Sequence, residues 1–160
     1  MLSFIQELET LRSKCLTIGY TSGVFDLLHQ GHLDYIYACR NLCDILVLGV
    51  DSDARVQISK GNQRPFQTVE DRIHTLKPLV NFVFEKRTAS IDYIRQIKPN
   101  VHFYSASRII ESSKIHELST LNNFKHIHFI QRNPNYSTTE KITKILIARN
   151  QENKLKMEPD

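Results

Sequence analysis

The chain has 160 residues, of which 41% are hydrophobic and 24% are charged, which is the size and composition of one ordinary globular domain. Three cysteines are too few for a disulfide framework, and no apolar run approaches the ~20 residues that a membrane-spanning helix needs. Residues 1–12 lack the basic start and long apolar stretch of a secretion signal. We therefore expect a cytoplasmic protein without membrane segments.

The charge balance favours an anionic ligand without identifying it. Lys and Arg number 21 against 17 Asp and Glu, a formal net charge of +4. Such a mild excess suits a phosphate ester or a nucleic acid, and it is also ordinary for a solvated surface. The basic residues are scattered and form no polybasic arm. We therefore expect no nucleic-acid partner.

Short segments rich in branched and aromatic residues alternate with segments of helical spacing. The predicted strands are 16–20, 45–50, 82–84, 101–104 and 126–130. The predicted helices are 1–12, one from about Gly31, 67–76, 91–97 and 142–148. This alternation predicts an α/β fold, a Rossmann-like open parallel sheet of about five strands with helices on both faces. We expect a single domain over 1–150 and a polar C-terminal tail over 151–160.

Ligands of such sheets bind at the carboxyl ends of the strands, so chemistry is expected just after Tyr20 and Val50. Two histidines, His29 and His32, straddle Gly31 where the first strand leads into a helix. A helix N-terminus offers N–H donors and a positive dipole end, which suit a phosphate. The pattern therefore predicts a phosphate site here.

Three other interpretations of these histidines remain open on residue chemistry alone. They could be capping or core residues. A metal site would need further ligands, and no Cys or acidic pair completes one convincingly. A dinucleotide-binding loop would need the Gly-x-Gly-x-x-Gly spacing, which is missing. We expect no metal held by the protein's own side chains.

Three segments, in order, resemble a known family. The first resembles the signature of the cytidylyltransferase-like nucleotidyltransferases: Gly23-Val24-Phe25-Asp26-Leu27-Leu28-His29-Gln30-Gly31-His32. The second, Lys60-Gly61-Asn62-Gln63-Arg64-Pro65 with Glu70-Asp71-Arg72, is similar to the adenylyltransferase domain of ADP-heptose synthases. The third, Arg132 with Tyr136-Ser137-Thr138-Thr139, resembles a segment of glycerol-3-phosphate cytidylyltransferases. The resemblance spans about residues 16–146.

The resemblance implies an enzyme that transfers a nucleoside monophosphate from a nucleoside triphosphate, ATP or CTP, to a sugar 1-phosphate. Pyrophosphate would leave after in-line attack on the α-phosphate, with Mg²⁺ bound mainly through the phosphates of the nucleotide. The alternative acceptors are glycerol-, ribitol- and amino-alcohol-phosphates. An alternative of another class is a catalytically silent nucleotide-binding or regulatory subunit. The resemblance also implies a homodimer.

The same resemblance implies roles for particular residues. The catalytic residues would be His29, His32, Lys60 and Arg132, with Lys60 in a mobile loop after the second strand. The nucleotide would also contact Gly23, Val24, Phe25, Asp26, Arg72, Ser137 and Thr138. Arg72 could equally pair with a nearby carboxylate. Ser137 and Glu140 fit a capping box that opens the last helix, independently of any family.

The chain departs from its relatives after the fourth strand. Where they carry a Gly-Asp type of turn, this chain has Phe103-Tyr104-Ser105-Ala106-Ser107-Arg108. We expect Arg64, Tyr104 and Arg108 to contact the acceptor, with Tyr104 stacking on a ring and Arg108 binding a phosphate. Cys39 and Cys43 are four residues apart, and we expect buried structural thiols. Tyr35 and Tyr37 are expected to be packing or surface residues.

Overall fold

The computed structural model of the chain describes residues 2–106 and 126–131. Several predictions concern residues outside these ranges, namely the helix at 142–148, the capping box at Ser137 and the tail at 151–160.

The described residues form one sheet of five parallel strands in the order β3-β2-β1-β4-β5. The strands are β1 Ile18–Gly23, β2 Ile45–Asp51, β3 Phe82–Lys86, β4 Val101–Ser105 and β5 His126–Ile130. All five strands predicted from the sequence are present, and the parallel α/β architecture is confirmed. Strands β2 and β3 lie on one side of β1, and β4 and β5 lie on the other. The switch point of the sheet is therefore between β1 and β4.

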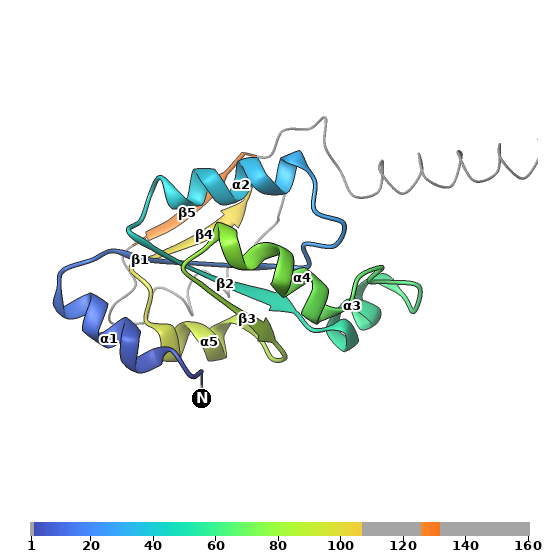
Figure 1. Cartoon of the computed structure of the whole chain (residues 1–160), viewed down its shortest axis with the longest axis horizontal. Helices are drawn as coiled ribbons and strands as arrows, with labels where there is room; N and C mark the ends of the chain where they lie inside the picture. The colour runs from blue at the N-terminus through green and yellow to red at the C-terminus, as the bar shows by residue number, and fades with distance from the viewer. Residues whose placement is uncertain (1, 107–125, 132–160) are drawn as a thin grey trace, which may run out of the picture.

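Helices cover both faces of the sheet (Figure 1). They are α1 Ile5–Ser13, α2 Gln30–Arg40, α3 Asp53–Lys60, α4 Val69–Leu76 and α5 Ser90–Ile97, with a 3₁₀ turn, η1, at Lys77–Leu79. One core cluster packs α2 and α4 against alternate strand residues such as Leu46 and Leu48. The other packs α1 and α5 against Ile18, Ile45 and Val47. Alternation along each strand thus supplies two cores.

The first strand lies further along the chain than predicted. It runs from Ile18 to Gly23 because Thr21, Ser22 and Gly23 continue to pair with β2. Hydroxyl residues and a glycine are poor strand signals in sequence, so the prediction ended the strand too early, at Tyr20.

Helix α3 was not predicted, and its presence corrects the expected loop position of Lys60. Lys60 is the last residue of α3, and Gly61 follows it with a φ of 90°. The Ser52 side chain caps the other end by accepting a hydrogen bond from the Arg55 N–H at 3.4 Å. Only Val56 of this helix is buried, and Ile58 is 87% exposed, so no apolar stripe marked the segment as helical.

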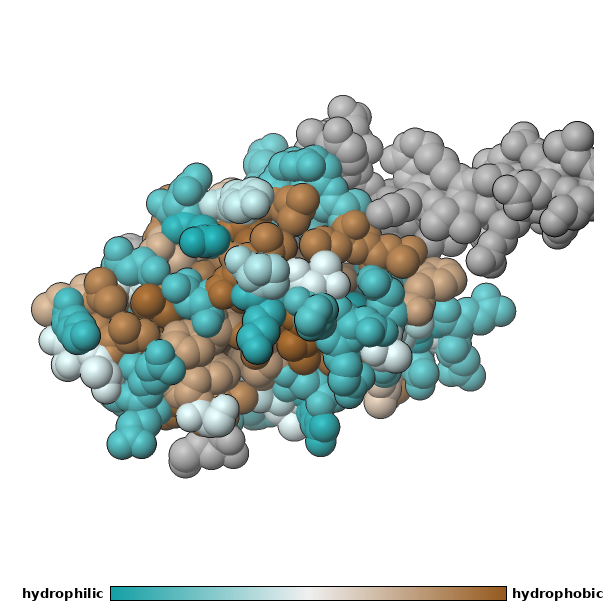
Figure 2. Space-filling view, in the orientation of Figure 1, coloured by the Kyte–Doolittle hydropathy of each residue, from teal (hydrophilic) through white to brown (hydrophobic). Residues whose placement is uncertain are grey.

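Hydrophilic residues are spread over the face of the molecule seen in Figure 2, and hydrophobic residues surface between them. The large exposed hydrophobic residues among those described are Tyr37, Leu42, Ile58, Phe66 and Phe129. Single apolar residues of this kind are ordinary on a folded domain. Within the described ranges, no helix has the length and apolar character needed to cross a membrane.

Two of the three cysteines lie in or beside the core, as predicted. Cys39 is fully buried and Cys43 is partly buried, whereas Cys15 is exposed. Burial raises the pKa of the Cys39 thiol to about 12 and that of the Cys43 thiol to about 11. Both groups are therefore neutral thiols near neutral pH.

Thiol labelling should distinguish these cysteines. Only the thiolate reacts, and at pH 8 only about one Cys43 in a thousand is ionised when its pKa is about 11. We expect iodoacetamide to label Cys15 alone in the native protein, and all three thiols after unfolding in guanidinium, as read by intact mass. Rapid native labelling of Cys39 would contradict the buried thiol.

Candidate functional site

A crevice opens at the switch point because β1 and β4 separate toward their carboxyl ends. The two strands pair at only two positions, Gly19 with Val101 and Tyr20 with His102, whereas β1 pairs with β2 along its whole length. A pocket of about 420 Å³ lies there. Its size and its place at the switch point are those of a ligand site in an open α/β sheet.

The Thr21 hydroxyl supports one wall of the pocket beyond the last β1–β4 pair. Its Oγ1 lies 3.2 Å from the Phe103 carbonyl oxygen, to which it donates, and 2.8 Å from the Tyr35 hydroxyl. Tyr35 was expected to be only a packing or surface residue. It is buried in the core cluster of α2 and also lines the pocket, whereas Tyr37 is an exposed residue of the same helix.

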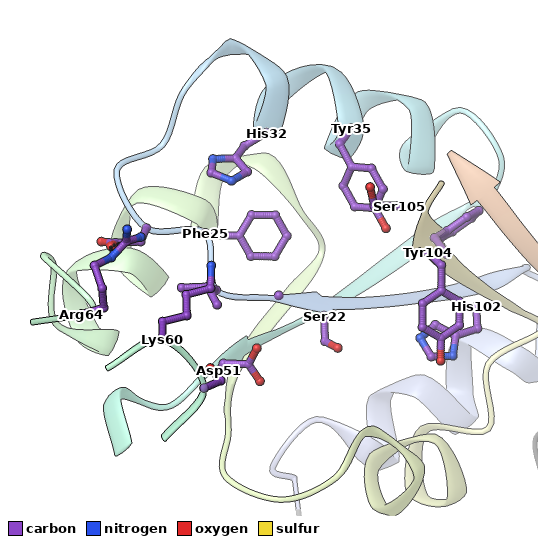
Figure 3. Close-up of a pocket in the computed structure, with 15 residues that line it drawn as sticks. Ser22, Phe25, His32, Tyr35, Asp51, Lys60, Arg64, His102, Tyr104 and Ser105 are labelled. Carbon is purple, nitrogen blue, oxygen red and sulfur yellow. Dashed lines mark hydrogen bonds and ion pairs between the residues drawn. The ribbon is translucent and has the colours of Figure 1, made fainter. Parts of the chain in front are cut away.

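The two histidines of the predicted phosphate site lie together at the N-terminus of α2. His29 is the N-cap residue, and its ring stacks on the ring of His32 with a centroid distance of 3.9 Å. His32 lines the pocket below α2, and its ring lies 5.4 Å from that of Phe25 (Figure 3). This arrangement presents imidazole N–H groups beside the positive end of a helix, which suits an anion.

The turn that leaves β1 is held by a segment far along the chain. Phe25 and Leu27 adopt left-handed backbone conformations, with φ of 52° and 49°. Between them, the Asp26 carboxylate accepts hydrogen bonds from Arg64 Nε at 3.0 Å and from the backbone N–H groups of Phe66 and Gln67. Asp26 is 2% exposed, so its side chain positions the turn instead of presenting a carboxylate to a ligand.

Arg72 lies behind the pocket, and its predicted contact with the nucleotide needs correction. The residue is 1% exposed and is not among those that line the pocket. Its guanidinium donates to the carbonyl oxygens of Val24 and Asp51 and forms an ion pair with Asp53, at 2.6 Å. It also donates to the Gln67 carbonyl. The alternative pairing with a carboxylate is the one observed.

The basic residues of the second segment approach the pocket from α3 and the loop that follows it. Lys60 is exposed and lines the pocket, as does Arg64. Arg64 is engaged by Asp26, with Nη2 2.8 Å from Oδ2, and its guanidinium lies 5.0 Å from the centre of the Phe66 ring. Lys60 is therefore the cation of this segment that is exposed at the site.

The pocket brings together most of the predicted residues within the described ranges. Gly23, Val24, Phe25, Asp26, His32, Lys60, Arg64 and Tyr104 line it, and His29 stacks against His32. Sequence reasoning missed Ser22, Asp51, Ser59, His102, Phe103 and Ser105. The predicted roles of Arg108, Arg132, Ser137 and Thr138 lie outside the described residues. Strand alternation could have pointed to Ser22 and Asp51, since each is polar at the end of a strand.

The described residues define a Rossmann-like α/β domain with a pocket at its switch point, and comparison with known proteins identifies its family. The family model described as cytidylyltransferase-like matches residues 20–144. The chain belongs to the cytidylyltransferase-like family of nucleotidyltransferases.

Similar curated proteins are longer than this chain. The bifunctional protein HldE of Helicobacter pylori strain HPAG1 is 35% identical over 147 residues, which cover 89% of this chain and 30% of HldE. HldE of Campylobacter concisus is 34% identical over 163 residues, 96% of this chain and 32% of the relative. The chain thus spans about a third of these relatives.

A solved structure shares the fold. The crystal structure of the lipopolysaccharide core biosynthesis protein from Thermoplasma volcanium superposes with a TM-score of 0.66 and 19% sequence identity. The alignment covers 74% of this chain and 98% of the other.

Removal of the Arg72 guanidinium should destabilise the domain. Arg72→Met leaves three carbonyl oxygens and Asp53 without their donor, and we expect a loss of about 3 kcal/mol in the free energy of unfolding. The measurement is urea unfolding followed by circular dichroism. Arg87→Met is the matched control, because Arg87 is exposed and pairs only with neighbouring Glu85 in the described structure. Equal stability of both variants would contradict the role of Arg72.

Proposed function

We propose that the protein transfers a nucleoside monophosphate from a nucleoside triphosphate to a sugar 1-phosphate, with release of pyrophosphate. The observation that carries the proposal is the stacked pair His29 and His32 at the N-terminus of α2, beside a pocket at the switch point of the sheet. Membership of the cytidylyltransferase-like family supports the nucleotidyl-transfer chemistry.

The reaction needs charge neutralisation more than a protein nucleophile. An oxygen of the acceptor phosphate attacks the α-phosphorus in line, and the bond to the oxygen that bridges to the β-phosphorus breaks. A phosphate monoester is already largely ionised near neutral pH because its second pKa is about 6, so no general base is required. Negative charge grows on the α-phosphoryl oxygens and on pyrophosphate. Hydrogen bonds from His29 and His32 and the charge of Lys60 would stabilise it.

The acceptor and the base are proposed from the second segment. Its resemblance to ADP-heptose synthases supports a sugar 1-phosphate as acceptor and ATP as donor. We assign Arg132 and the Ser137-Thr138 segment to the leaving phosphates, as the third motif implies, and Arg108 to the acceptor's phosphate. Homodimerisation stays a prediction of the same resemblance.

We propose that Mg²⁺ arrives bound to the triphosphate, where it would offset the phosphate charge. Within residues 2–106 and 126–131, no three His, Cys, Asp or Glu side chains come together as metal ligands. The two carboxylates at the pocket are already ion-paired, Asp26 with Arg64 and Asp51 with Lys86. These residues fit an ion held by phosphate oxygens better than an ion held by protein carboxylates.

Pyrophosphate release tests the proposal. The protein is incubated with Mg²⁺, with ATP, CTP, GTP or UTP, and with a panel of sugar 1-phosphates and polyol phosphates. We expect release with one donor–acceptor pair. Because each histidine supplies a hydrogen bond to the transition state, His29→Ala and His32→Ala should each lower kcat by about a hundredfold or more.

His74→Ala is the matched control, because His74 is an exposed residue of α4 and does not line the pocket. Its activity should equal that of the unmodified protein. Nucleotide binding without turnover for any acceptor would favour the catalytically silent subunit. Turnover that survives both histidine substitutions would contradict the assigned site.

A further inference from the structure

The strands change character at their carboxyl ends on the face that packs against α1 and α5. Ile18 and Tyr20 of β1, and Ile45 and Val47 of β2, belong to the core cluster on this face. The final residues that alternate onto the same face in β1, β2 and β3 are polar, namely Ser22, Asp51 and Lys86, and Tyr104 of β4 lies on this face as a buried residue of the same core. A polar recess therefore lies above the α1–α5 core, on the opposite side of β1 from His32.

Figure 3 shows this division of the pocket. His32 and Tyr35 reach toward the pocket from α2 on one side of β1, whereas Ser22 and Asp51 lie on the other side with His102 and Tyr104. We call these last four residues, Ser22, Asp51, His102 and Tyr104, the α5-side recess.

Contacts within the described residues hold the α5-side recess in shape. The His102 and Tyr104 ring centroids lie 4.1 Å apart, and the ring of Tyr20, on the neighbouring strand, lies 5.0 Å from that of His102. Ser22 Oγ lies 3.3 Å from the hydroxyl oxygen of Ser90, the first residue of α5. Gly49 leaves room here, because a Cβ atom would come within 3.1 Å of the Tyr20 hydroxyl.

The charge of the recess is set by a buried ion pair. Lys86 is 4% exposed, and its Nζ lies 2.7 Å from Asp51 Oδ1. Arg55 Nε approaches the same oxygen at 3.5 Å. A buried ion pair seldom stabilises a fold more than apolar packing would, so stability alone does not account for this pair. Asp51 lines the pocket and Lys86 does not, so the pocket meets a carboxylate whose orientation is fixed from behind.

This set of groups matches alcohol hydroxyls better than a phosphate. A carboxylate accepts hydrogen bonds from hydroxyl groups, and a serine hydroxyl can both donate and accept. Lys86 and Arg55 both pair with Asp51, and neither of them lines the pocket. The cation exposed at the pocket, Lys60, comes from α3.

We propose that the α5-side recess binds the hydroxyl-bearing body of the acceptor and so selects a polyol or sugar phosphate. The inference rests on the proposed function: the acceptor's phosphate would lie toward the α2 N-terminus, and its carbon chain or ring would enter the recess. Ser22 and Asp51 are then specificity residues, the buried His102 and Tyr104 form the wall beside them, and the buried Lys86 is a positioning residue that acts through Asp51.

Hydroxyl deletions test the recess in the full chain. With the acceptor that gives turnover, Ser22→Ala should raise the acceptor KM by about three- to tenfold, the effect of one lost hydrogen bond. The nucleotide KM should stay within about twofold. Tyr37→Phe is the matched control, because it removes a hydroxyl from an exposed residue outside the pocket.

Asp51→Asn removes the charge while keeping the shape of the side chain. We expect the acceptor KM to rise about tenfold or more, as for a hydrogen bond to a charged group. Because the change also leaves Lys86 without its counter-charge, thermal unfolding by circular dichroism checks that the variant is folded. Lys86→Met should produce the same selective rise in acceptor KM if Lys86 acts by orienting Asp51.

A series of acceptors separates the outcomes. Ethyl phosphate, glycerol 3-phosphate, ribitol 5-phosphate, glucose 1-phosphate and mannose 1-phosphate are compared with the preferred nucleotide. We expect kcat/KM to be far lower for ethyl phosphate, which has no hydroxyl group, than for the best polyol or sugar phosphate. Equal use of ethyl phosphate, or unchanged acceptor KM in folded Ser22→Ala and Asp51→Asn, would overturn the recess and leave the transferase standing. Absence of turnover with every acceptor would overturn the proposed function itself.

Discussion

The site depends on a clamp between the turn that leaves β1 and the segment that leads into α4. Buried Asp26 accepts hydrogen bonds from the backbone of Phe66 and Gln67, and buried Arg72 donates to the carbonyl of Val24. In both contacts the donors belong to the segment around α4 and the acceptors to the turn after β1; in the first the side chain comes from the turn, and in the second it comes from α4. The two contacts hold a turn that contains two non-glycine residues with positive φ, a conformation that local sequence alone does not favour. The shape of this turn sets the position of the α2 N-terminus.

The switch point of the sheet explains why one pocket has two chemically different sides. The pairing of β1 with β4 ends after two residue pairs, so the carboxyl ends of the strands open both toward α2 and toward α5. The α2 side carries imidazoles at a helix N-terminus, which suit phosphate. The α5 side carries hydroxyl groups and a carboxylate held by Lys86, which suit the neutral body of a substrate. The proposed transfer between a nucleotide and a phosphorylated acceptor would use both kinds of surface.

Sequence reasoning worked best for residues that the local secondary structure brings together. His29 and His32 stand three positions apart at a helix start, so their proximity follows from the helix itself. Arg72 was misjudged because its partners on other elements, Val24, Asp51 and Asp53, lie 19 to 48 residues away in the chain, in contacts that only packing creates. Asp26 lines the pocket as predicted, but its contacts with Phe66 and Gln67 also depend on packing. Arg72 and Asp26 both belong to the family's motifs, but a motif does not distinguish a residue that contacts a ligand from one that supports the pocket from behind.

The sequence by itself determined the architecture, since five apolar strand segments separated by helical ones permit little besides a parallel sheet covered on both faces. It also determined that His29 and His32 meet at the start of α2. The tertiary structure alone decided which polar residues share the pocket. Asp51 and Lys86 end different strands, and their ion pair exists because β2 lies beside β3 in register. Helix α3 likewise forms with one buried residue, Val56. The Ser52 cap and neighbouring elements stabilise it, and no apolar pattern in the sequence indicates it.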